Sequence, residues 1–165
     1  MKESNTYLNL KTLRLNMIIK IKNLKYKIRN CNNTDYKPIY NLFKKNMCAL
    51  FLKHWGGWKP ETFKKDFNKK NIKIIEHNKK IIAFYDLQFK TNCSYIHNIQ
   101  IATAMQGKGL GSYLMKEMEE RTKKQKLNKI RLRVFKDNPA KKLYLKQGYK
   151  QIKDEGSSVI LEKKL

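Results

Sequence analysis

Residues 94–111 read SYIHNIQIATAMQGKGLG, and this stretch decides the fold because a β-prone run leads directly into a loop with three glycines. The run predicts a strand over residues 94–102, and the apolar spacing beyond the loop predicts a helix over residues 109–126. Glycines allow positive φ angles and a close approach of the backbone to a ligand. Free N–H groups at a helix start favour an anion, and Lys108 adds a positive charge there. The pattern predicts a pyrophosphate cradle, with a tight turn that binds nothing as the alternative.

The segments on either side of this stretch alternate between strand and helix patterns. Further strands are predicted over residues 26–29, 72–76, 80–89, 129–135, 149–153 and 158–163, and further helices over 35–52, 61–68 and 139–148. A strand-loop-helix-strand unit with antiparallel strands on both sides implies a mixed sheet. The expected fold class is therefore α/β of the α+β type, with a mixed six- to seven-stranded sheet and helices on both faces.

The chain is expected to divide at residue 24. Residues 1–24 mix apolar and basic residues without a clear helix start, so they are described as an N-terminal extension, either packed or loose. A start at Met17 is an alternative. Residues 25–165 are expected to form one domain. The first nine residues are polar, and no apolar run approaches the about 20 residues of a membrane span. We therefore expect a cytoplasmic protein without a membrane partner.

The net charge of +25 raises the question of a nucleic-acid partner. The charge comes from 33 lysines and only 5 arginines, and the lysines are scattered over the whole chain. Nucleic-acid sites more often use arginine for bidentate contacts. A basic nucleic-acid-binding domain therefore remains an alternative, but nucleic acid is not the expected partner.

The cysteines predict neither disulfides nor metal binding. Cys31, Cys48 and Cys93 stand alone, their number is odd, and none has the spacing of a metal ligand relative to a histidine. We expect free thiols in a reducing compartment and no metal cofactor.

Two well-known phosphate loops are excluded by the glycine spacing. The P-loop pattern Gly-x4-Gly-Lys-Ser/Thr is absent. The dinucleotide pattern Gly-x-Gly-x-x-Gly would need a glycine at Ser112 or at Leu114, depending on the register, so it fails as well.

The loop instead resembles the coenzyme A motif of the GNAT acyltransferase superfamily. Gln106-x-x-Gly109-x-Gly111 is similar to the family pattern Arg/Gln-x-x-Gly-x-Gly/Ala, with a strand before it and a long helix after it. A second segment, NPAKKLYLKQGY (138–149), resembles the family's Asn…Leu-Tyr…Gly-Phe/Tyr sequence. The resemblance covers residues 26–165 and is specific between residues 99 and 149.

The resemblance implies an acetyl-CoA site and a mechanism. The fourth and fifth strands, 94–102 and 129–135, would be parallel and splayed to admit the pantetheine arm. The amide of Ile101 would polarise the thioester carbonyl, and Tyr144 would protonate the leaving thiolate. Asn138 would bind the pantetheine arm, or simply cap a helix. The implied cofactor-binding residues are Ile99, Gln100, Ile101, Thr103, Gln106, Gly107, Lys108, Gly109, Leu110, Gly111, Ser112, Asn138 and Tyr144.

The general base is not given by the family pattern. Arg133 and Tyr95 stand where branches of the family place a glutamate. His97 has a suitable pKa range, and strand alternation would put it on the face of Ile99 and Ile101, beside the thioester. A packed structural histidine, or a base acting through water from Glu76 or Asp86, are the alternatives.

The acceptor pocket is expected over the splayed strands, lined by His54, Trp55 and Trp58, unless the tryptophans only pack a lid. The expected function is an acetyl-CoA-dependent N-acetyltransferase acting on a primary amine of a small molecule or protein. A fold member that binds CoA without catalysis is the alternative, and both a monomer and a homodimer are left open.

Overall fold

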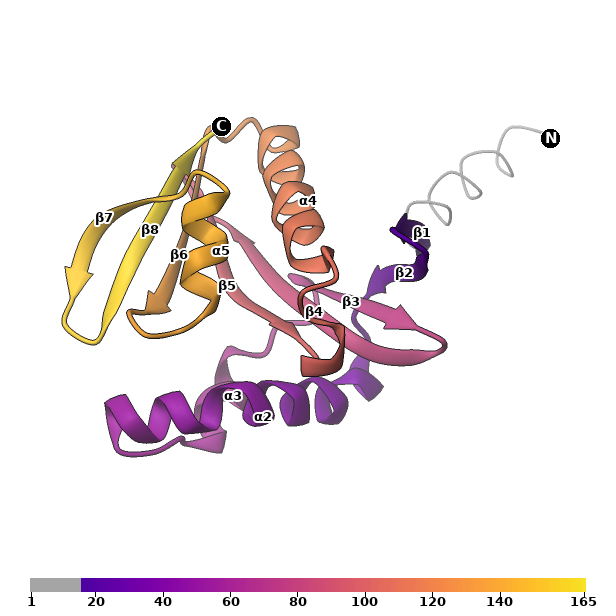
Figure 1. Ribbon diagram of the computed structural model, residues 1–165, viewed down its shortest axis with the longest axis horizontal. Helices are drawn as coiled ribbons and strands as arrows, with labels where there is room; N and C mark the ends of the chain where they lie inside the picture. Colours follow the sequence, from indigo (N-terminus) through magenta and orange to yellow (C-terminus); the bar gives the residue numbers. More distant parts are fainter. Residues whose placement is uncertain (1–15) are drawn as a thin grey trace.

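The computed structural model describes residues 16–165, which form one mixed sheet with helices on both faces (Figure 1). The strand order is β1-β2-β3-β4-β5-β6-β8-β7, and only the β5–β6 pair is parallel. The strands are β1 (Asn16–Ile21), β2 (Leu24–Asn30), β3 (Ile72–His77), β4 (Lys80–Phe89), β5 (Ser94–Ile101), β6 (Lys129–Phe135), β7 (Lys150–Glu155) and β8 (Ser158–Lys164). The helices are α2 (Tyr36–Trp55), α3 (Pro60–Asp66), α4 (Leu110–Lys124) and α5 (Ala140–Lys146), with short 3-10 turns at Asn33–Asp35 and Thr103–Met105.

The mixed α/β architecture is confirmed, but the sheet has eight strands rather than six or seven. The additional strand, β1, pairs antiparallel with β2 over its whole length. It comes from the segment expected to be an extension, and residues 1–15 of that segment lie outside the described residues. In its sequence NMIIKI, Ile18 interrupts the alternation of the apolar residues Met17, Ile19 and Ile21 with polar ones, and only Ile19 is buried.

Each face of the sheet has its own apolar core because side chains alternate along the strands. Ile75 belongs to the core under α4, whereas its neighbour Ile74 belongs to the core under α2 and α3. Helix α4 presents one buried stripe to the first core, formed by Leu110, Leu114, Met115 and Met118. The helices of the two faces therefore approach the sheet from opposite sides, as Figure 1 shows.

The parallel pair separates toward the carboxyl ends of its strands, as expected. The pairing of β5 with β6 covers only Ser94–Ile96 and Ile130–Leu132. Strand β5 continues to Ile101 and β6 to Phe135 without further pairing between them. A gap between the two strands thus opens in the middle of the sheet, where α2 crosses it from one side.

Within residues 16–165, no helix combines the length and the apolar composition that crossing a membrane requires.

Candidate active site

The opening between β5 and β6 belongs to a cavity of about 1250 Å³. Its lining runs from the glycine loop before α4, through the gap, to α2 and α3 on the other face of the sheet. Eleven of the thirteen residues expected to bind the cofactor line it: Ile99, Gln100, Ile101, Thr103, Gln106, Gly107, Gly109, Gly111, Ser112, Asn138 and Tyr144. The other two do not line it: the Lys108 side chain is exposed to solvent, and the Leu110 side chain is buried in the core.

The glycine loop supplies free amides at the start of α4. Gly107 and Gly109 have φ angles of 70° and 89°, which favour glycine, and Gly109 is the N-cap residue. The first amides of a helix have no intrahelical partners, and no side chain caps α4, so its first amides are free to bind a ligand. A Cβ on Gly111 would lie 3.0 Å from Cδ2 of Leu143 in α5, so a larger residue there would require the Leu143 side chain to shift. The loop therefore has the free donors and the backbone access that a phosphate group requires.

The free edge of β5 also presents backbone groups to the gap. The amide of Ala102 donates to the carbonyl of Ile82 in β4 (2.8 Å), and the register is continuous from there to Asn98. Because antiparallel pairs alternate between bonded and non-bonded positions, Ile99 and Ile101 direct their N–H and C=O groups away from β4, toward β6. Strand β6 no longer pairs there, so these amides are available to a ligand in the gap.

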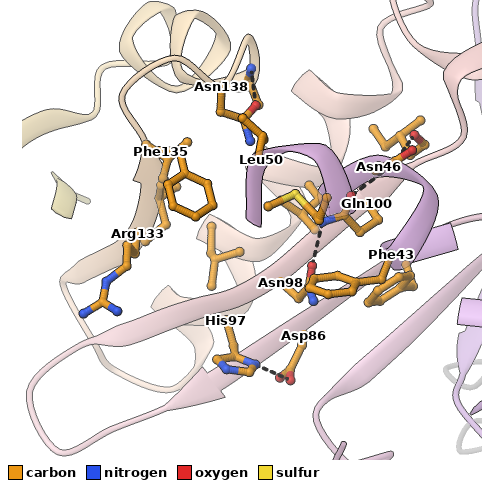
Figure 2. A pocket seen from close by; sticks show the side chains of 18 of the residues that line it. Phe43, Asn46, Leu50, Asp86, His97, Asn98, Gln100, Arg133, Phe135 and Asn138 are labelled. Carbon is orange, nitrogen blue, oxygen red and sulfur yellow. Dashed lines mark hydrogen bonds and ion pairs between the residues drawn. The ribbon is translucent and has the colours of Figure 1, made fainter. Parts of the chain in front are cut away.

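One of these groups, the Ile101 carbonyl, is already held by two side-chain amides. It accepts hydrogen bonds from Nδ2 of Asn46 in α2 (3.1 Å) and from Nε2 of Gln106 (3.0 Å). Asn46 also donates to Oε1 of Gln100 (3.0 Å), and Nε2 of Gln100 donates to Oδ1 of Asn98 (2.9 Å) (Figure 2). This network ties α2 to the end of β5. The side chain of Gln100 is thus held in this network, and its backbone groups point toward Phe84 in β4.

Tyr144 and Asn138 both reach the cavity from the α5 segment. Tyr144 is only 6% exposed, and burial raises the pKa of its hydroxyl to about 12, so it keeps its proton at neutral pH. Oδ1 of Asn138 accepts a hydrogen bond from the amide of Ala140 (2.9 Å), the bond expected if it caps the helix. Capping and cavity lining thus coexist at this residue.

His97 lies on the other face of β5 from the one expected. The register shifts at the pairs Asp86–Asn98 and Leu87–Ile96, so His97 is the extra residue of a β-bulge. The bulge breaks the alternation: Ile96, Ile99 and Ile101 all pack toward the α4 face. His97 instead contacts Asp86 and Asp66 on the α2–α3 side of the cavity. The expectation that it shares a face with Ile99 and Ile101 was therefore wrong.

Two carboxylates flank the His97 ring. Nδ1 lies 3.2 Å from Oδ2 of Asp86, and Nε2 lies 3.9 Å from Oδ2 of Asp66, the last residue of α3. The hydrogen bond to Asp86 raises the pKa of His97 above 6.5, although burial and the charge of Lys90 oppose the shift. Glu76, an alternative base, is paired with Arg29 and lies outside the cavity lining.

The acceptor pocket differs in part from the expectation. Trp55 and Trp58 line the cavity, but His54 does not. Its ring stacks on Phe135 at the end of β6, with centroids 4.8 Å apart, and its Nε2 lies 2.8 Å from Oδ1 of Asp137. His54 therefore links the end of α2 to the end of β6.

Sequence reasoning missed Asn46, Asp66 and Phe135. Asn46 could have been noticed as a polar position between the apolar residues of the α2 pattern. Asp66 and Phe135 carry no local signal, because only the tertiary fold brings them to the cavity. Over residues 16–165, histidine, cysteine and acidic side chains form no group of three that could hold a metal ion.

A family model described as an acetyltransferase (GNAT) domain matches residues 48–159. The GNAT domain of the S. lividans protein PAT superposes with a TM-score of 0.72 at 14% identity, covering 92% of this chain and 98% of that one. The PaiA N-acetyltransferase of Thermoplasma acidophilum, in complex with coenzyme A, gives 0.70 at 19% identity, covering 85% and 99%. The ribosomal-protein-S18-alanine N-acetyltransferase of Escherichia coli gives 0.66 at 20% identity, covering 83% and 92%. At these identities the structural likeness concerns the fold.

Proposed function

The chain belongs to the GNAT acetyltransferase family, and from this premise we propose that it transfers the acetyl group of acetyl-CoA to a primary amine. The observation that carries the proposal is the single cavity that joins the glycine loop, the free edge of β5 and His97. Donor and acceptor sites must meet in such a space, because transfer requires the reacting atoms to be in contact.

The residues of the donor side fit acetyl-CoA. The uncapped amides at the start of α4 would hold its pyrophosphate, and the outward amides of Ile99 and Ile101 would hold the pantetheine arm. Bound there, acetyl-CoA supplies an acyl group activated as a thioester. The amide of Ile101 would donate a hydrogen bond to the carbonyl oxygen and stabilise the negative charge that develops on it.

Proton transfers are assigned to two side chains that line the cavity. His97 takes a proton from the ammonium group of the acceptor, which frees the nitrogen lone pair for attack on the acyl carbon. The new C–N bond forms and the C–S bond breaks. Tyr144 donates its hydroxyl proton to the departing sulfur, and its high pKa keeps that proton available until the thiolate forms. Solvent then takes the second proton of the new amide nitrogen and the proton on His97, and it returns one proton to Tyr144, so that one proton is released overall.

The test combines binding and turnover. Acetyl-CoA should raise the melting temperature, because a ligand that binds only the folded state stabilises it. Thiol release should then depend on an added amine. His97→Gln should slow turnover and flatten the acidic limb of the pH profile, while the shift produced by acetyl-CoA persists. His77→Gln, at a half-buried histidine outside the cavity lining, is the matched control.

Two results would decide against the proposal. A melting shift with acetyl-CoA but no amine-dependent thiol release would identify a CoA-binding member of the fold without catalysis. Full activity in His97→Gln would leave the transfer reaction in place but remove His97 from it.

A further inference from the structure

The carboxylates of this basic chain are almost all paired with a lysine or arginine. In residues 16–165, only the side chains of Glu61, Asp66 and Asp86 have no lysine or arginine nitrogen within 4.0 Å. Two of these three, Asp66 and Asp86, line the cavity and flank His97, whereas Glu61 is exposed outside the lining. With 38 basic and 13 acidic residues in the sequence, unpaired carboxylates concentrated at one cavity call for an explanation.

Asp86 is a buried carboxylate that is only half satisfied. Its side chain is 4% exposed, and Oδ2 contacts His97 (Figure 2). The other oxygen, Oδ1, is buried and has no hydrogen-bond partner within the described part of the chain. A buried carboxylate oxygen without a donor is unfavourable, so a ligand that brings positive charge to this end of the cavity would be stabilised.

Asp66 offers a second carboxylate that a ligand can reach directly. Its side chain is 45% exposed at the end of α3, and Oδ2 lies 3.9 Å from Nε2 of His97. Two carboxylates and a protonated His97 sum to a charge of −1, and with a neutral His97 to −2. The cluster is therefore negative in either state of the histidine. Lys45, Lys59 and Arg133 also line the cavity, but no lysine or arginine nitrogen of residues 16–165 lies within 4.0 Å of these two carboxylates.

We propose that this cluster selects an acceptor that carries a second positive charge besides the amine to be acetylated, and that Asp66 and Asp86 bind that charge. The inference rests on the proposed acetyl transfer and names its substrate class: a diamine-like cation. Such a group would reach Asp66 from the open cavity and compensate the field of Asp86 behind it. An acceptor with a carboxylate would be repelled by the same two groups.

The second positive charge of the acceptor would also favour the neutral form of His97, the proposed base. A cation bound at Asp66 opposes the protonation of His97, because like charges in one site disfavour each other. His97 would then be neutral in the complex and able to take the proton of the reacting ammonium group. The other groups that act on His97 are Lys90, which opposes its protonation, and the two carboxylates, which favour it.

The test compares three acceptors of similar length: 1,4-diaminobutane, n-butylamine and 4-aminobutyrate. We expect kcat/KM for the diamine to exceed that for butylamine by about tenfold or more, the range of one hydrogen bond to a charged group, with aminobutyrate below both. Raising the salt concentration should reduce the preference. Parity of the three acceptors would overturn the inference while leaving the transfer reaction established.

A matched pair of variants localises the effect. Asp66→Asn should reduce the ratio of diamine to butylamine toward one, mainly through KM for the diamine. Glu61→Gln removes the same charge from the same helix outside the cavity, and the ratio should persist. If Asp66→Asn keeps the full ratio, the cluster does not bind the second charge.

A binding measurement separates the two proposals. 1,4-Diaminobutane should raise the melting temperature of the wild-type protein more than butylamine does, and Asp66→Asn should lose that difference. If no amine is acetylated, the proposed function fails, and this measurement still decides the cation site. Two peptides test whether the acceptor is a protein: in one the reacting lysine has a lysine neighbour, and in the other it has an alanine neighbour. If the peptide with the lysine neighbour has a higher kcat/KM than both the alanine peptide and the diamine, the second charge belongs to a protein.

Discussion

At the α4 end of the cavity, the groups proposed to hold acetyl-CoA are mainly backbone amides, whereas the groups proposed to hold the acceptor at the α2–α3 end are side chains. The donor end comes largely from one continuous stretch, residues 99–111, completed by Asn138 and Tyr144. The acceptor end is assembled from α2, α3, β4, β5 and β6. A backbone site depends on where glycines allow the chain to go, and a side-chain site depends on which residues the fold brings together. The two ends should therefore respond to different substitutions.

The largest expected effect comes from the point where the two ends meet. Tyr144→Phe should lower kcat by about 10²–10⁴-fold, the range for a positioned general acid, because only the proton donor is lost. The melting shift produced by acetyl-CoA should persist, since the ring of residue 144 is retained and the phosphates are expected on backbone amides of the glycine loop. Tyr113→Phe, at a tyrosine outside the cavity lining, is the control. An unchanged kcat in Tyr144→Phe would show that water or the acceptor supplies the proton.

The next prediction tests the backbone nature of the donor end. Gly109→Asp should weaken acetyl-CoA binding by about 100-fold or more, because a carboxylate would face the phosphates and like-charge contacts cost several kcal/mol. Gly156→Asp is a matched control at φ 78°, against 89° at Gly109, and nothing lies near its Cβ position. Both variants should lose stability from the strained backbone, but only Gly109→Asp should lose the acetyl-CoA shift in a melting assay. Equal acetyl-CoA shifts in the two variants would contradict the cradle.

The acceptor end should be sensitive to pH. As the proposed base, His97 would act when neutral, and its pKa is raised above 6.5, so the rate should rise with pH through a midpoint above 6.5. Asp86→Asn removes the largest cause of that shift, and the midpoint of kcat/KM should therefore move to lower pH. Asp66→Asn should move it in the same direction by less, since its contribution is the smaller one. A midpoint that both variants leave in place would assign the limb to another group.

The smallest effect concerns the link between the two ends. Asn46→Ala should lower the free energy of unfolding by about 1–2 kcal/mol, because it removes hydrogen bonds to Gln100 and to the Ile101 carbonyl. Asn41→Ala, at an exposed asparagine of the same helix, should change it by less than about 0.5 kcal/mol. Urea denaturation measures both. Equal effects would mean that the network contributes nothing beyond helix propensity.

The two ends also differed in how far the sequence predicted them. The glycine loop and the splayed strands were predictable, because glycine spacing and strand-helix order are local features. Strand β1 was not, since only Ile19 is buried in it and the pairing with β2 is what makes it a strand. The face of His97 was predicted wrongly because nothing in the residues around it indicates a bulge. Asp66 was missed because α3 and β5 are distant in sequence.

The bulge at His97 has a consequence for how this strand can vary. Side chains along a strand alternate between two faces, and the extra residue interrupts this alternation between Ile96 and Ile99. Deleting His97 would restore strict alternation, and Ile96 and Ile99, then two positions apart, would both still face the α4 core. That deletion would shorten the strand without exchanging its faces, whereas deleting Gln100 would place Ile99 and Ile101 on opposite faces. His97 is therefore a residue that the alternation of the strand does not require, and its place in the cavity is a matter of chemistry rather than of the fold.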